Sequence, residues 1–127
     1  MATPRRPTPA ELEILRVLWA RGPSTVREVQ EGLGSARAAG YTTVLKLMQI
    51  MTDKGLVRRD ERARAHVYEA RAPETQTQRQ LVRDLVDRAF GGSAAQLVMQ
   101  ALSGRRASPA EIERIRRLLD EIEGGKK

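Results

Sequence analysis

Residues Gly40 to Gly55 read GYTTVLKLMQIMTDKG, and this stretch decides how the rest of the chain is interpreted. Val44, Leu47 or Met48, and Met51 recur at three- and four-residue steps, which predicts a helix with one buried face. The other face carries hydroxyls, an amide, a cation and one apolar side chain, at Thr42, Thr43, Gln49, Lys46 and Ile50. The periodicity also fits an ordinary amphipathic helix, so the flanking elements must decide its role.

The chain is basic, and its charge is unevenly distributed. Its 127 residues include 23 Lys and Arg against 16 Asp and Glu, which gives a net charge of +7 at pH 7. Residues 1–72 hold 13 basic and 8 acidic side chains, whereas residues 73–127 hold 10 and 8. This excess favours a polyanionic partner for the first part of the chain. The length suits one domain, or a small domain with an added assembly region.

Several functional classes are disfavoured by composition. The chain has no cysteine, which excludes disulfides, thiolate catalysis and cysteine-based metal sites and predicts a cytoplasmic location. Apolar runs are only a few residues long, so we expect no membrane insertion. The single histidine, His66, has no partner nucleophile or carboxylate at a recognisable spacing. We therefore predict neither an enzyme nor a bound cofactor.

Two helices are predicted before Gly40. Thr8-Pro9-Ala10-Glu11 combines a hydroxyl cap, a proline in the first turn and a glutamate three residues after the cap. The first helix should run to Arg21, where glycine and proline end it. Ser24 or Thr25 caps a second, short helix, and Glu28 lies three residues after Thr25. The inward residues are predicted to be Leu12, Leu15, Leu18 and Trp19 in the first helix and Val26, Val29 and Leu33 in the second.

Two short β-like runs follow the helix, at residues 56–60 and 65–70. They predict a hairpin in which Val67 and one face of the first strand pack on the helices. Three helices followed by a basic hairpin is the winged-helix arrangement, in which the third helix enters the major groove and the hairpin contacts the DNA backbone or minor groove. The predicted DNA-binding domain is 1–72, and its candidate contact residues are Thr42, Thr43, Lys46, Gln49, Arg58, Arg62 and Arg64.

Residues 73–127 predict three further helices. Gly91-Gly92 ends the first, Ser93 caps the second, and the segment from Ser108 to Glu111 repeats the capping pattern of the first helix of the chain. A unit of this size is marginal alone and needs a partner surface, most simply a second copy. The alternative is that this region folds back on the first domain. The candidate dimerisation residues are Leu81, Leu85, Phe90, Leu97, Leu102, Ile112, Ile115 and Leu119.

The predicted fold class is therefore mainly α with a small β-hairpin, a winged helix-turn-helix domain followed by a helical dimerisation region. The predicted function is sequence-specific binding of double-stranded operator DNA by a homodimer. The alternative is a winged-helix adaptor for protein contacts, in which the basic hairpin is only solvated. Binding selection on random duplexes separates these two hypotheses.

Several motifs together resemble a known family. They are Leu12-Glu13 with Leu18-Trp19, Tyr41-Thr42-Thr43-Val44 leading into Lys54-Gly55-Leu56-Val57, Val67-Tyr68 with Ala70, and the helix start from Ser108. Nearly the whole chain resembles the penicillinase-repressor family of BlaI/MecI-type bacterial transcription regulators. The resemblance implies a homodimer on a palindromic operator that blocks transcription. It also implies release through a membrane-bound sensor protease, with cleavage near Gln100-Ala101; these two residues differ from the pair cut in well-known members.

Overall fold

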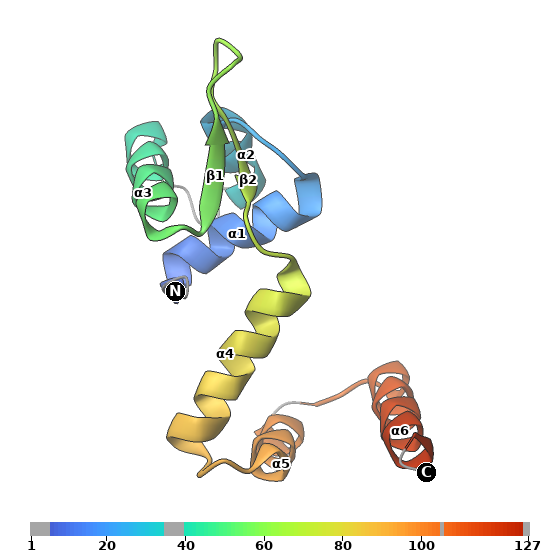
Figure 1. The fold of residues 1–127 in the computed structure, drawn as a ribbon. Helices are drawn as coiled ribbons and strands as arrows, with labels where there is room; N and C mark the ends of the chain where they lie inside the picture. Colours follow the sequence, from blue (N-terminus) through green and yellow to red (C-terminus); the bar gives the residue numbers. More distant parts are fainter. Residues whose placement is uncertain (1–5, 35–39, 105, 126–127) are drawn as a thin grey trace. The chain divides into compact units, whose positions relative to one another are not determined.

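The computed structural model describes residues 6–34, 40–104 and 106–125. They form six helices and one two-stranded antiparallel sheet (Figure 1), which confirms the predicted mainly α class with a small hairpin. The chain divides into two compact units, residues 1–82 and 83–127, while a functional boundary after residue 72 stays a prediction. The elements are α1 (Pro9–Arg21), α2 (Val26–Leu33), α3 (Tyr41–Lys54), β1 (Val57–Asp60), β2 (Val67–Ala70), α4 (Glu74–Ala89), α5 (Ala94–Gly104) and α6 (Pro109–Gly124).

Both predicted capping boxes of the first unit are present. At α1, the Thr8 hydroxyl accepts a hydrogen bond from the Glu11 amide at 3.2 Å, and the Glu11 carboxylate accepts one from the Thr8 amide at 3.0 Å. Thr25 and Glu28 make the same reciprocal pair at α2. These bonds satisfy amides that a helix start otherwise leaves without a partner. Short sequence signals therefore fix where both helices begin.

The recognition-helix candidate α3 has the predicted bounds and the predicted buried face. Val44, Met48 and Met51 are fully buried, and Gly55 ends the helix in the left-handed conformation at φ 82°. Gly40 is the N-cap residue and provides no side-chain hydrogen bond. The connection predicted at residues 35–39 lies outside the described residues.

The core of the first unit lies between α1, α2, α3 and the hairpin. Trp19 packs at its margin and donates its indole N–H to the Ala72 carbonyl at 3.0 Å, so this side chain is structural. Leu12 packs against the core as predicted and is partly buried, while Ile14, which the sequence analysis did not place inward, is fully buried. The buried apolar residues are Ile14, Leu15, Leu18, Val26, Val29, Val44, Met48, Met51, Leu56, Val57 and Tyr68.

The hairpin forms as predicted, but its strands are shorter and a different side chain enters the core. Val57 pairs with Ala70, and Asp60 pairs with Val67. Tyr68 is 1% exposed while Val67 is only half-buried, so the prediction that Val67 packs on the helices was wrong. The backbone of Tyr68 exchanges two hydrogen bonds with Ser24, at 2.8 and 2.9 Å. This bridge fixes the strand against the segment before α2 and turns Tyr68 inward.

A buried ion pair ties the end of α3 to the start of α1. Glu11 is 2% exposed, and the Lys54 ammonium donates to its two carboxylate oxygens at 2.9 and 3.0 Å. A buried carboxylate without such a partner costs several kcal/mol, about 3 to 5 when one member of a pair is removed. The pair therefore holds the C-terminal end of α3 in a defined position on the body of the domain.

The remaining helices begin and end at the predicted signals. Gly91 and Gly92 follow α4 with φ values of 57° and 85°. The Ser93 hydroxyl accepts from the Gln96 amide at 3.1 Å, and Ser108 forms a capping box with Glu111 at α6. Helix α4 spans the division between the two units.

Candidate nucleic-acid interface

The outer face of α3 brings four predicted contact residues together. All four are exposed: Thr42, Thr43, Lys46 and Gln49. Lys46 follows Thr42 by four residues and Thr43 by three, and Gln49 follows Thr42 by seven, so these side chains lie on neighbouring turns of one helix face. The buried residues of α3 face the opposite side. This surface therefore offers hydroxyls, an ammonium and an amide in one row, the groups that contact phosphates and base edges in protein–DNA complexes.

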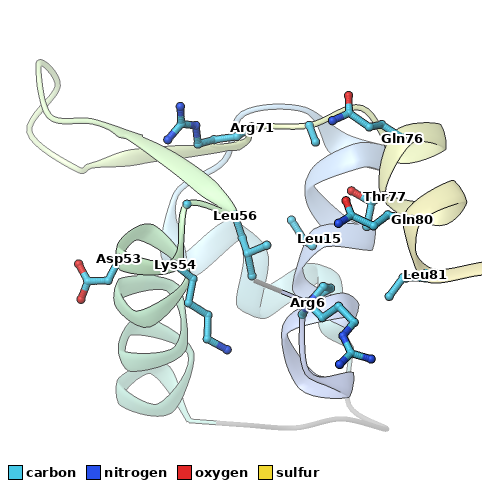
Figure 2. Close-up of a pocket in the computed structure, with 13 residues that line it drawn as sticks. Arg6, Leu15, Asp53, Lys54, Leu56, Arg71, Gln76, Thr77, Gln80 and Leu81 are labelled. Atoms are coloured by element: carbon cyan, nitrogen blue, oxygen red, sulfur yellow. The ribbon is translucent and has the colours of Figure 1, made fainter. Parts of the chain in front are cut away.

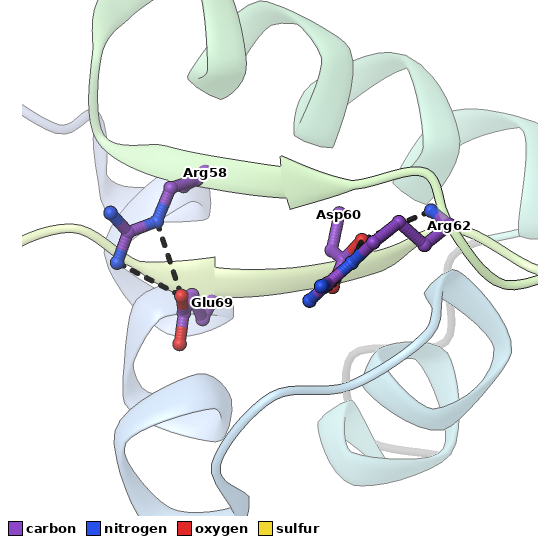
Figure 3. Close-up of polar contacts among 4 residues, drawn as sticks. All are labelled: Arg58, Asp60, Arg62 and Glu69. Atoms are coloured by element: carbon purple, nitrogen blue, oxygen red, sulfur yellow. Dashed lines mark hydrogen bonds and ion pairs between the residues drawn. The ribbon is translucent and has the colours of Figure 1, made fainter.

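The wing, defined here as residues 57–70, pairs two of its three predicted arginines with carboxylates of its own (Figure 3). The Arg58 guanidinium lies 2.9 Å from the Glu69 carboxylate across the two strands. Arg62 lies 2.8 Å from the Asp60 carboxylate. All four groups are substantially solvent-exposed, so each pair contributes little to stability. The consequence is electrostatic, because a phosphate must compete with these carboxylates for both arginines.

Hydrogen bonds from Arg62 lower the pKa of the Asp60 carboxyl group. The Arg62 side chain, and next its backbone N–H, donate to the Asp60 carboxylate and lower the pKa of Asp60 from 3.8 to about 2. The same pair raises the pKa of Arg62. The lowered pKa changes the charge of Asp60 only in acid, because an aspartate with the ordinary value of 3.8 is also ionised at physiological pH.

Arg64, the third predicted wing contact, lies in the exposed loop between β1 and β2 together with His66. Within the part of the chain that the structure describes, Arg64 has no carboxylate partner. Its guanidinium is therefore more available to a phosphate than those of Arg58 and Arg62.

The structure adds one cation that sequence analysis missed. The guanidinium carbon of Arg27, on α2, lies 5.7 Å from the ring centroid of Tyr41, the first residue of α3. Such a cation–π contact holds an arginine in place without neutralising its charge. Arg27 is exposed, so it adds a positioned cation next to the start of α3. Nothing in the local pattern around Arg27 indicates this pairing, because the two residues meet only through the packing of α2 on α3.

The first unit also contains a crevice of about 460 Å³ (Figure 2). Leu15 and Leu56 line its apolar part, while Asp53 and Arg71 are directed away from them. Its Lys54 ammonium is already bound to buried Glu11. Among residues 6–34, 40–104 and 106–125, no three His, Asp or Glu side chains gather as a metal ion would require.

The predicted dimerisation residues retain accessible apolar surface in the single chain. Leu85, Leu102 and Leu119 are 48%, 39% and 55% exposed. Leu81, Phe90, Leu97, Ile112 and Ile115 are half-buried. The structure adds Met99, which is 60% exposed, and the apolar surface of Val98, Leu118 and Ile122.

The predicted cleavage residues, Gln100 and Ala101, lie within α5 and are exposed. None of the helices in the described segments combines the length and the hydrophobicity that a membrane crossing requires.

These features define a winged-helix protein with a helical C-terminal region. The chain belongs to the penicillinase repressor family, whose model matches residues 7–121. It is 31% identical over 116 residues to proteins described as "Transcriptional regulator BlaI" in two strains of Mycobacterium tuberculosis, covering 91% of this chain and 83% of each relative. It is 23% identical over 118 residues to a "Penicillinase repressor" of Bacillus licheniformis, covering 93% of this chain and 92% of that protein.

Proposed function

We propose that this protein is a cytoplasmic transcriptional repressor that binds a palindromic DNA operator as a homodimer. The observation that carries the proposal is the polar, cationic outer face of α3 on a winged-helix domain, in a chain of the penicillinase repressor family. Relatives in that family are themselves described as a transcriptional regulator and a repressor.

In the proposed complex, α3 enters the major groove with its N-terminal end nearest the bases. The first-turn amides of α3 are not capped by a side chain, so they can donate to a phosphate together with the hydroxyls of Thr42 and Thr43. Lys46 and Gln49 then face base edges or phosphates, and the wing arginines contact the backbone. Arg58 and Arg62 must leave a carboxylate to bind a phosphate, whereas no carboxylate is paired with Arg64 or Arg27 among the described residues. Arg64 and Arg27 are therefore the preferred contacts to the DNA backbone.

The dimer is proposed to form through residues 73–127. Its two winged-helix domains would occupy half-sites about 34 to 36 Å apart, or a multiple of that spacing. Linking two weak half-site contacts in one dimer raises the overall affinity without any new contact. The exposed apolar side chains of α4, α5 and α6 support this proposal, since association of two copies would remove them from water.

Release through a sensor protease is proposed to act on the Gln100–Ala101 bond. This bond lies in the interior of α5, which spans Ala94–Gly104. Cleavage there would require local unwinding of α5, a helix with no buried side chain. Few buried contacts oppose that opening.

The test of the proposed function is a binding selection on random DNA duplexes with the full chain. We expect enrichment of a palindrome whose half-sites follow the one-turn spacing or a multiple of it. Recovery of no preferred sequence, with binding that depends only on salt, would contradict the repressor proposal and favour the adaptor hypothesis.

A variant of α3 tests which surface binds. Lys46→Ala should weaken binding to the selected duplex by about 1 to 3 kcal/mol, the range for a good base contact. Arg62→Ala combined with Arg64→Ala should instead reduce the salt dependence with little change in sequence preference. Arg114→Ala on α6 is the matched control, because it also removes one exposed cation. An unchanged affinity in both test proteins would show that the assigned surface is wrong.

A further inference from the structure

Ile50 is an exposed apolar side chain on the outer face of α3. It is 38% exposed, whereas Val44, Met48 and Met51 on the buried face are fully enclosed. It lies four residues after Lys46 and seven after Thr43, so it shares the face proposed to enter the groove. The structure thus places one branched hydrocarbon among polar and cationic contact residues.

The chemistry of the major groove offers one partner for such a side chain. Base edges there present hydrogen-bond donors and acceptors, and thymine alone adds a C5-methyl group. An isoleucine side chain neither donates nor accepts hydrogen bonds, so it can favour one base only through apolar contact. We propose that Ile50 selects thymine in each half-site by contact with its C5-methyl group.

Two features favour a base edge over other partners. The exposed neighbours of Ile50 on α3 are Lys46, Gln49 and Asp53, and the nearest apolar neighbour on that helix, Leu47, is half-buried and packs against the core. Helix α3 therefore presents no broad apolar patch around Ile50 that would suit docking of a protein. Asp53, three residues further along, carries a carboxylate that repels phosphate. The DNA backbone is therefore disfavoured near this part of the helix, which leaves base edges as the partner of Ile50.

The inference rests on the proposed function, and its test begins with the duplex recovered by selection. Each thymine of the half-site is replaced in turn by deoxyuridine, which removes the methyl group and leaves base pairing intact. At one position, we expect the unmodified protein to lose about fourfold in affinity per half-site, as expected for one buried methyl group. Ile50→Ala should bind the thymine and uracil duplexes equally well.

Thr52→Ser is the matched control, because Thr52 also carries a methyl group on α3 but lies outside the assigned contact surface, with its hydroxyl bonded to the Met48 carbonyl. This variant should retain the thymine preference. The inference is overturned if no uracil replacement weakens binding, if the half-site contains no thymine, or if the preference persists in Ile50→Ala.

The two proposals fail in different ways. A selection that enriches no sequence refutes the proposed function, and this inference with it. A selection that yields a clear palindrome without methyl dependence refutes only the role of Ile50. Far-ultraviolet circular dichroism of Ile50→Ala checks folding, and its partly exposed position predicts a native spectrum.

Discussion

Asp60 shows how a single residue can set the charge of the wing. Its carboxylate accepts hydrogen bonds from the backbone and the side chain of Arg62, and its pKa falls to about 2. Because the pKa of Asp60 in the folded protein lies below its ordinary value of 3.8, the pairing stabilises the folded wing above pH 3.8. This stabilisation is lost as the pH falls from there through about 2. The charge of this pair is therefore constant wherever the protein would bind DNA.

We predict that removing the arginine side chain weakens the acidity of Asp60. In Arg62→Ala, the pKa of Asp60 should rise from about 2 partway toward 3.8, because the side-chain hydrogen bonds are lost while the backbone N–H of residue 62 still donates to the carboxylate. Nuclear magnetic resonance titration of the Asp60 carboxyl carbon measures this directly. Arg64→Ala should leave that pKa unchanged. Equal titration of Asp60 in Arg62→Ala and in the unmodified protein would refute the pairing.

Some residue roles cannot be deduced from the sequence. Thr42, Thr43, Lys46 and Gln49 could be placed on an outer face, because helical spacing separates them from the apolar residues of α3. The contact between Arg27 and Tyr41 could not, since it depends on how α2 packs against α3. The pairing of Arg58 with Glu69 likewise depends on strand register, which alternation alone does not fix.

Among the elements, α1 and α2 approach each other closely at Gly32. A Cβ atom added at Gly32 would lie 2.6 Å from one methyl carbon of Val17 and 3.4 Å from the other. Valine has one strongly preferred rotamer in a helix, so its methyl groups cannot easily move away. Glycine is therefore required here by helix packing.

We predict that Gly32→Ala destabilises the protein by about 1 to 3 kcal/mol, the usual range for an overpacked contact. In a Val17→Ala background, the same substitution should become neutral or stabilising by up to about 1 kcal/mol, because alanine favours a helix more than glycine does. Urea unfolding of the four proteins measures both effects. An equal loss in both backgrounds would mean that Val17 is not the obstacle.

Helix ends were predictable because their signals are local. Thr8, Thr25 and Ser108 each act with a glutamate three residues later, and all three capping boxes form. The inward face of β2 was not predictable in the same way. Val67 and Tyr68 are adjacent apolar residues, so alternation allows either to point inward. The backbone bridge between Ser24 and Tyr68, which joins distant segments, decides between them.

For the molecule as a whole, we predict that assembly and operator binding depend on the same apolar surface. Leu85→Asp or Ile115→Asp should weaken dimerisation at least 100-fold, because two-fold symmetry introduces each charge twice and removes two buried side chains. Sedimentation equilibrium measures assembly, and fluorescence anisotropy measures operator affinity.

Ala110→Asp is the control for the α6 substitution, since it adds the same charge at an exposed position on a different face of that helix. It should preserve both the dimer and the operator affinity. A Leu85→Asp protein that sedimented as a monomer yet bound its operator normally would break the proposed link between assembly and binding.

The internal ion pairs of the wing also bear on how a repressor would find its target among the many other sequences of a genome. Non-specific attraction to a duplex comes almost entirely from cations that meet phosphates. Arg58 and Arg62 already have carboxylate partners, so they draw the protein less strongly to arbitrary DNA. In the proposed complex, such a wing would shorten residence on wrong sites and leave more of the population free to sample new ones. The search for the operator would be faster because the protein's own carboxylates partly neutralise Arg58 and Arg62.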